Sequence, residues 1–133
     1  MSLQRWGGQK VEMSFTPHLL PTRRGIIASV YAKTSRKISD ADVSAAFAQS
    51  FKDYALVRVK NLKDAGSERD LRLSRVVGSP RTHIVWNLDG DRLTVFSLID
   101  NLLKGAASQA IENFNALYGF DGTLGLENKE GIL

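Results

Sequence analysis

Two arginines in a proline-bracketed loop are the first candidates for ligand binding. Arg23 and Arg24 follow Pro17 and Pro21. Proline rings fix φ and remove backbone donors, so we expect this loop to be irregular and stiff. A guanidinium held there can clamp a carboxylate or a phosphate through paired hydrogen bonds. A surface ion pair is the alternative, and it is the favoured interpretation for Arg23.

A second candidate group lies where the last predicted strand gives way to the last predicted helix. The side-chain amide of Asn101 can satisfy both the donor and the acceptor atoms of a carboxamide ligand. Asparagine also caps helices, so a purely structural role is equally open. Lys104 can meet a phosphate or an acidic side chain near the start of the helix. Gly105 is expected to permit close packing rather than to bind a ligand.

The usual catalytic groups are poorly represented. The sequence has no cysteine, which excludes a thiol nucleophile, a disulfide and a thiolate metal ligand within this chain. Its two histidines, His18 and His83, show no metal-ligand spacing. We expect His18 to form structural hydrogen bonds rather than to act as a catalyst, and His83 to face outward from a strand. No glycine-rich phosphate loop follows a predicted strand, and no metal site is predicted.

Composition predicts one cytoplasmic domain. A chain of 133 residues with 43% hydrophobic content can bury a core without disulfides. The net charge of +4 favours anionic ligands only weakly, and the arginines of residues 69–81 lack a nucleic-acid-binding motif. There is no secretory signal, and no apolar run approaches the ~20 residues of a membrane-spanning helix. We therefore predict neither nucleic acid nor membrane as a partner. The abrupt start at Met1 indicates a piece of a longer protein.

Strands are predicted on both sides of the candidate loop and in the second half of the chain. Apolar residues alternate with polar ones in residues 10–15, while residues 26–32 are apolar on both faces, which indicates an interior strand. Asp89 and Gly90 favour a tight turn with positive φ, so the flanking runs form a predicted hairpin. The strand predictions are residues 10–15, 26–32, 56–59, 71–73, 82–88 and 91–98.

Two helices are predicted to cover this sheet. Ser39 and Asp42 have the spacing of a capping box, and large side chains recur at helical spacing through residue 54. From Leu103 onward, small and apolar residues trace a second helix that Gly119 can terminate. Residues 120–133 form a predicted docked tail. The predicted fold is α+β, with a mixed or mostly antiparallel sheet covered by helices.

The sequence resembles the N-acetyl-gamma-glutamyl-phosphate reductase family. Residues 97–115 (SLIDNLLKGAASQAIENFN) are similar to its C-terminal signature. Residues 15–21 (FTPHLLP), followed by Arg24, Gly25 and Ile26, resemble its proline-bracketed loop, and residues 118–126 resemble its tail. Aspartate-semialdehyde dehydrogenases share a motif of the Asp-Asn-Leu-x-Lys-Gly-Ala kind. The Thr-Pro-His-Leu loop favours the acetylglutamyl-phosphate enzymes and their lysine-pathway relatives, which use aminoadipate derivatives.

The resemblance implies an NADPH-dependent reductase of arginine biosynthesis. In this family a thiolate attacks N-acetyl-glutamyl 5-phosphate, phosphate leaves, and hydride from NADPH releases N-acetylglutamate 5-semialdehyde. The family's cysteine, its Rossmann NADP-binding half and its His-x-Pro-Glu histidine all precede the Thr-Pro-His-Leu loop. None of them is present here, so we expect the chain alone to be inactive. A non-catalytic self-association module is the alternative.

The resemblance also assigns the candidate residues. Asn101 and Lys104 are predicted to bind the cofactor, since relatives of this fold use an asparagine for the nicotinamide carboxamide. Arg24, which fits the family motif better than Arg23, is predicted with His18 to bind the substrate. Residues 1–100 would belong to a sheet domain like the catalytic and dimerisation domain of glyceraldehyde-3-phosphate-dehydrogenase-like reductases. Residues 101–133 would pack on the Rossmann domain, in a homo-oligomer that is a dimer or a tetramer.

Overall fold

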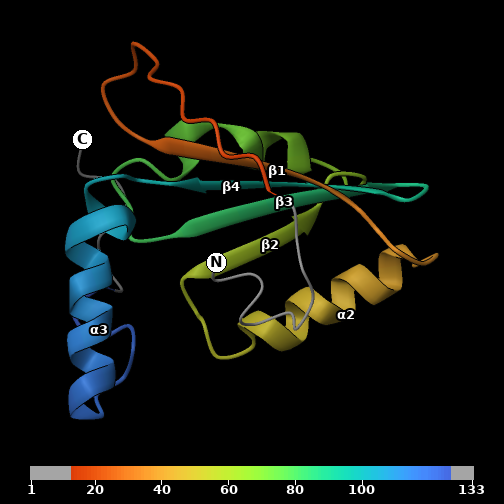
Figure 1. The fold of residues 1–133 in the computed structure, drawn as a ribbon. Helices are drawn as coiled ribbons and strands as arrows, with labels where there is room; N and C mark the ends of the chain where they lie inside the picture. Colours follow the sequence, from red (N-terminus) through yellow and green to blue (C-terminus); the bar gives the residue numbers. More distant parts are fainter. Residues whose placement is uncertain (1–12, 127–133) are drawn as a thin grey trace.

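The computed structural model describes residues 13–126, which form a sheet with one helix on a face and another at its end (Figure 1). The strands and α-helices are β1 (Ile26–Lys33), α2 (Asp40–Phe51), β2 (Val57–Asn61), β3 (Thr82–Asp89), β4 (Arg92–Ile99) and α3 (Ser108–Tyr118). Two 3₁₀ segments, η1 (Ser67–Leu71) and η2 (Leu73–Arg75), precede β3, and a π-helical turn, η3 (Leu103–Ala107), leads into α3.

The sheet has four strands in the order β1-β4-β3-β2. Strands β1 and β3 run antiparallel to β4, whereas β2 runs parallel to β3. Helix α2 lies on one face of the sheet, the 3₁₀ segments lie on the other, and α3 stands at one end (Figure 1). The predicted α+β class with a mixed sheet is therefore confirmed.

The hydrophobic core lies between α2 and strand β3. Trp86 and Leu88 are buried against Val43 of the helix, and the ring of Phe47 stacks on Trp86 at 6.3 Å between centroids. The helix begins at the predicted capping box. The hydroxyl of Ser39 accepts the amide hydrogen of Asp42 at 3.2 Å, and the Asp42 carboxylate accepts that of Ser39 at 2.8 Å.

The predicted hairpin is also confirmed. Asp89 of β3 pairs directly with Arg92 of β4, and Gly90 between them has a φ of +60°. Two residues thus close the turn, and the left-handed conformation there is one that glycine adopts without steric cost. Strand β4 of this hairpin lies in the centre of the sheet. It ends at Ile99, just before the candidate residues near position 101.

The predicted strand at residues 71–73 is wrong. These residues lie in 3₁₀ turns instead, in which Arg69 O accepts the amide hydrogen of Arg72. A three-residue alternation is too short to specify a strand, and here tertiary packing decides. The side chain of Leu73 fills the space beside Gly25, where an added Cβ would lie only 2.7 Å from Leu73 Cδ2. Gly25 also has a φ of +106°, so this position favours glycine on two grounds.

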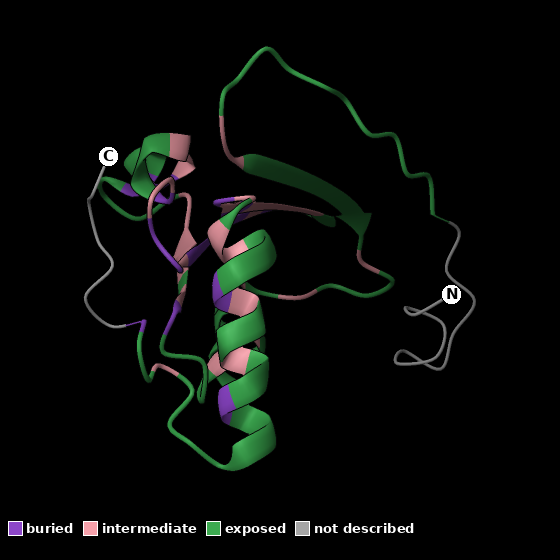
Figure 2. Cartoon of the chain, turned by 90° about the vertical axis from the view of Figure 1, so that its left-hand side faces the viewer, coloured by how far each residue is buried: buried purple, intermediate pink, exposed green. Residues whose placement is uncertain are grey.

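Strand β1 is not the interior strand that its composition predicts. It lies at the edge of the sheet, and all eight of its residues are exposed (Figure 2). Val30 and Tyr31, on opposite faces, are 54% and 74% exposed. Of the strand predicted at residues 10–15, the described part, Met13–Phe15, is not in a strand, and residues 10–12 lie outside the described residues. Within residues 13–126 no strand therefore pairs with the outer edge of β1.

The last helix begins with a wider turn than predicted. The amide of Gly105 donates to Asp100 O at 2.9 Å and that of Ala107 to Leu102 O at 3.1 Å, which is the i to i+5 pattern of a π turn. Gly119 ends α3 with a φ of +70°, as predicted. The large apolar side chains of α3 are mostly exposed, while its buried residues, Ser108 and Asn115, are polar.

The first part of the tail packs back on α3. The side-chain amide of Asn115 donates to Leu124 O at 3.0 Å, and Leu126 is buried. The docked tail is thus confirmed through Leu126, and residues 127–133 lie outside the described part.

Candidate functional site at the junction of β4 and α3

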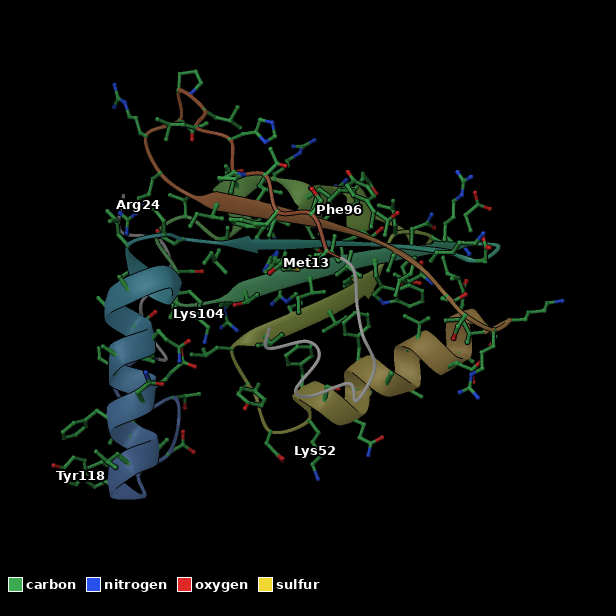
Figure 3. The ribbon with its side chains drawn as sticks, in the orientation of Figure 1. Met13, Arg24, Lys52, Phe96, Lys104 and Tyr118 are labelled. Atoms are coloured by element: carbon green, nitrogen blue, oxygen red, sulfur yellow. The ribbon has the colours of Figure 1, made fainter. Side chains whose placement is uncertain are left out.

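The two candidate segments meet where β4 ends. The amide of Gly25 donates to Oδ1 of Asn101 at 2.7 Å, across 76 positions of sequence. Next to this bond, Nε of Arg24 lies 2.7 Å from Oδ2 of Asp100. Figure 3 shows Arg24 close to the first turn of the last helix, at the end of the sheet. Two consecutive residues at the end of β4 therefore hold two consecutive residues at the start of β1.

Asp100 is the centre of this junction, although the sequence analysis assigned it no role. Its side chain is fully buried. Oδ1 accepts the amide hydrogens of Leu102 at 2.8 Å and Leu103 at 3.0 Å. Oδ2 accepts that of Gly78 at 2.7 Å and faces Arg24. An aspartate two or three residues before a helix start is a capping signal, and that signal could have identified it.

The Asp100 carboxylate remains ionised in this environment. Burial alone would raise its pKa. The Gly78 amide, the Arg24 guanidinium and the two helix-start amides outweigh that effect, and together they hold the pKa of Asp100 below its usual value. A buried charge with hydrogen-bonding partners on both oxygens is stable, whereas removal of one partner leaves an uncompensated charge.

Asn101 does not cap the helix. Asp100 caps it instead, by accepting the Leu102 amide hydrogen. The structural contact of Asn101 is the hydrogen bond that its oxygen accepts from the Gly25 amide. The Nδ2 group of Asn101 makes no hydrogen bond with the described residues, and the residue is partly exposed. The donor half of the amide is therefore unpaired within residues 13–126.

Lys104 meets an acidic side chain, which was one of its two predicted partners. Its Nζ lies 2.7 Å and 2.6 Å from the two carboxylate oxygens of Glu112. Both side chains are largely buried, at 12% and 15% exposure. The lysine charge is thus already neutralised within the helix, which weakens the case for a direct phosphate contact.

A small apolar cavity lies beside Arg24. It has a volume of about 270 Å³, opens to solvent, and is lined mostly by apolar groups of the last helix and the tail. Arg24 contributes to its wall, together with Leu103, Ala107, Ile111 and Leu126. A guanidinium at the edge of an apolar cavity is suited to an anionic group attached to a short carbon chain.

His18 is exposed in the loop before β1 and makes no hydrogen bond or ion pair with the described residues. The structural hydrogen bonds expected of His18 are therefore not found within residues 13–126, and the other histidine also differs from prediction. His83 is only 2% exposed, so the expectation of an outward strand residue is wrong. It occupies β3, which α2 covers on one face and η1 on the other, so both faces of the strand are buried. Its position within a run of apolar residues was the available signal.

Burial sets the chemistry of His83. Its Nδ1 lies 3.5 Å from Oδ1 of Asp70, and neither ring nitrogen has a hydrogen-bond partner in the described part of the chain. Burial lowers the pKa of His83. The charge of Asp70 raises it in part, while Arg58 and Arg75 lower it further. The ring is therefore neutral at pH 7.

Residues 13–126 contain no group of three or more metal-ligating side chains. No helix in that range combines the length and apolar character needed to span a bilayer.

The four-stranded mixed sheet, with two antiparallel pairs and one parallel pair, defines an α+β sheet domain rather than a parallel-stranded Rossmann unit. The model of the semialdehyde dehydrogenase dimerisation domain matches residues 1–101, and the chain belongs to this family. The match includes Arg24, Asp100 and Asn101, while α3 follows it.

Curated relatives match nearly the whole chain. A protein named N-acetyl-gamma-glutamyl-phosphate reductase from Streptococcus thermophilus is 40% identical over 94% of this chain and 35% of its own length. Proteins of the same name from Geobacillus stearothermophilus and Idiomarina loihiensis are 37% and 44% identical over 96% and 92% of this chain, and over 36% and 32% of their own lengths. The chain therefore spans about a third of the length of these relatives.

Proposed function

We propose that this chain is the C-terminal part of an NADPH-dependent reductase that converts N-acetyl-glutamyl 5-phosphate to N-acetylglutamate 5-semialdehyde in arginine biosynthesis. The observation that carries the proposal is the meeting of the two family-like segments. Residues 15–26 and 97–115 resemble the same family, and the bonds between Arg24 and Asp100 and between Gly25 and Asn101 join them. The names of the relatives point to the same activity.

In this proposal the junction positions the substrate and the cofactor. Nε of Arg24 is held by Asp100, so the outer edge of the guanidinium binds an anionic group of the acyl phosphate. The free Nδ2 of Asn101 donates to the carboxamide oxygen of the nicotinamide. These two groups fit an anion and a carboxamide. His18 is a second substrate contact from the exposed loop, and Lys104 is a second cofactor contact, with the weaker case because Glu112 neutralises it.

The remaining chemistry is assigned to the rest of the longer protein. This chain has no cysteine, so the nucleophile that forms the thioester must come from outside it. Bound NADPH would supply the hydride that reduces the thioester. The residues of this chain orient the two reactants, and such positioning accounts for a large part of many enzymatic rate enhancements.

The proposal includes a cytoplasmic homo-oligomer, a dimer or a tetramer. The family is defined by a dimerisation domain. The exposed edge strand β1, with apolar side chains on both faces, supplies surface that an oligomer can cover.

The test is an assay of the full-length protein with NADPH and N-acetyl-glutamyl 5-phosphate. We expect reduction of this substrate at a higher kcat/KM than that of the aminoadipyl and aspartyl acyl phosphates. The 133-residue chain alone should show no turnover. Preference for an aminoadipyl substrate would reassign the enzyme to the lysine pathway. Absence of any acyl-phosphate reduction by the full-length protein would refute the proposal and favour a non-catalytic assembly module.

A further inference from the structure

The geometry at the end of β4 assigns a role to a residue that touches neither proposed ligand. We propose that Asp100 is a positioning residue, which holds the Arg24 guanidinium and the Asn101 amide in a fixed relation so that substrate and cofactor bind in one geometry. This inference rests on the proposed reductase function. It extends that function to a buried residue behind the ligand-binding side chains.

Asp100 acts only through its neighbours. A carboxylate has about four lone-pair directions; three backbone amides donate to Asp100, and Arg24 pairs with it as an ion pair. Two amides of the last helix approach Oδ1 at 2.8 Å and 3.0 Å, while the Gly78 amide and the Arg24 Nε each approach Oδ2 at 2.7 Å. The side chain is fully buried, so no ligand can reach it without displacing one of these groups.

These contacts join three separate segments. The loop before β3 is held at Gly78, the start of β1 at Arg24, and the π turn at Leu102 and Leu103. The backbone oxygen of Asp100 also accepts the Gly105 amide, which closes the π turn. One residue therefore fixes both the direction of the last helix and the start of β1.

The fixed direction matters most for Arg24. Its side chain is 22% exposed and lines the apolar cavity, so the guanidinium lies between the buried carboxylate and the proposed anion. The ion pair with Asp100, 2.7 Å from Nε, restrains the planar group and favours one orientation of its outer N–H donors. Without the carboxylate, the Arg24 side chain would become ordered only on substrate binding, and the loss of its conformational entropy would weaken that binding.

The substitution that tests this is Asp100→Asn in the full-length protein. The asparagine amide has the shape of the carboxylate, but its NH₂ group is a donor. At either oxygen position it would face another N–H donor instead of accepting from it. We expect KM for the acyl phosphate to rise by roughly tenfold, since one charge-assisted contact is lost. The expected change in kcat is less than about threefold. Asp91→Asn is the matched control, because Asp91 pairs with exposed Lys33 at 3.1 Å on the hairpin.

A double-variant cycle separates positioning from a purely structural role. If Asp100 positions the substrate through Arg24, then at saturating NADPH adding Asp100→Asn to Arg24→Gln should lower kcat/KM for the acyl phosphate no further than Arg24→Gln alone. Multiplicative losses would overturn the proposal, as would a lower melting temperature for Asp100→Asn with an unchanged KM. Should Asp100→Asn fail to fold, Arg24→Lys serves instead. It keeps the charge but not the planar fork, so KM should still rise about tenfold, and an unchanged KM would overturn the proposal.

Hydrogen exchange distinguishes this inference from the proposed function. The Gly25 amide bonds to Asn101 and not to Asp100, so its exchange reports whether Asp100 orders its neighbours. We expect at least roughly tenfold faster exchange of Gly25 in full-length Asp100→Asn, and the same rate as wild type would refute the positioning role. If the wild-type protein reduces no acyl phosphate, the reductase function fails, while the exchange result still decides the role of Asp100.

Discussion

The amide of Gly25 donates to Oδ1 of Asn101 at 2.7 Å, which ties the start of β1 to the end of β4. This bond commits the oxygen of the Asn101 side chain and leaves its two Nδ2 hydrogens. The oxygen of the residue is therefore structural, and the NH₂ group is the half that we propose binds the cofactor. This asymmetry also gives a way to change one half without the other.

Asn101→Asp should weaken NADPH use while the protein stays folded. An aspartate keeps an oxygen for the Gly25 amide and loses both Nδ2 hydrogens. We expect the NADPH KM of the full-length protein to rise by roughly tenfold, since ~1.4 kcal/mol corresponds to a factor of ten. Asn101→Ala should show the same rise and also a lower melting temperature, because the Gly25 bond is lost as well.

The control for this pair is Asn113→Asp, which adds the same charge on the exposed side of α3 and keeps the oxygen that accepts from Gln109. Its NADPH KM should match wild type. If both Asn101 variants lose thermal stability and retain the wild-type KM, then Asn101 is only structural and the cofactor assignment is wrong.

His83 should make the fold sensitive to mild acid. Its folded pKa is lowered below 6.5 by burial, so below that pH the unfolded chain binds the proton more readily than the folded chain. The contribution of this residue is therefore complete above pH 6.5 and is lost as the pH falls through the folded pKa, at up to about 1.4 kcal/mol per pH unit. Urea unfolding between pH 7.5 and roughly pH 4.5, above most carboxylate titrations, measures this slope.

His83→Gln should flatten that slope, whatever its effect on absolute stability. The matched control is His18→Gln, which changes the exposed histidine and should leave the slope unchanged. The assignment fails if His18→Gln flattens the slope or if the His83 variant keeps it.

The capping box of α2 should contribute measurably to stability. Ser39→Ala removes the acceptor for the Asp42 amide, and loss of such a cap costs about 1 kcal/mol. Chemical denaturation compares this variant with Ser44→Ala, an exposed serine within the same helix. The second substitution should be neutral or slightly stabilising, because alanine favours helix interiors. Equal effects at the two positions would contradict a specific role for the cap.

Strand β1 should mediate self-association. Val30 is 54% exposed on the edge strand, and a lysine there is a common natural defence against strand pairing. Sedimentation velocity should show the wild-type chain as an oligomer and Val30→Lys shifted toward the monomer. Ala46→Lys, at an exposed position of α2, is the control and should sediment as wild type. A monomeric wild-type chain at high concentration would refute the prediction.

Local signals predicted the elements whose causes are local. The Asp89-Gly90 turn, the Ser39 cap and the Gly119 helix end each depend on residues within four positions of one another, and all three are confirmed. The 3₁₀ turns at residues 67–75 were missed because their conformation depends on packing against β3 and against Gly25, just before β1, which no short pattern encodes.

The candidate site was predicted in part for the same reason. Resemblance to a family indicated Arg24 and Asn101, but not the buried carboxylate behind them, because its role appears only when residues 24, 78 and 102 meet. The position of His83 depends on which elements cover β3, and β1 was misplaced because exposed apolar strands and interior strands have the same composition.

The π turn before α3 sets the rotation of this helix about its own axis. A turn with i to i+5 bonds contains one more residue than an α-helical turn, so the ion pair between Lys104 and Glu112 spans eight positions rather than the seven that two ordinary turns would span. Deleting one residue of the turn would rotate everything after it by about 100°. Ser108 and Asn115 would then leave the interior, and a different stripe of the helix would point outward. The angular setting of the whole C-terminal helix thus depends on a single inserted residue.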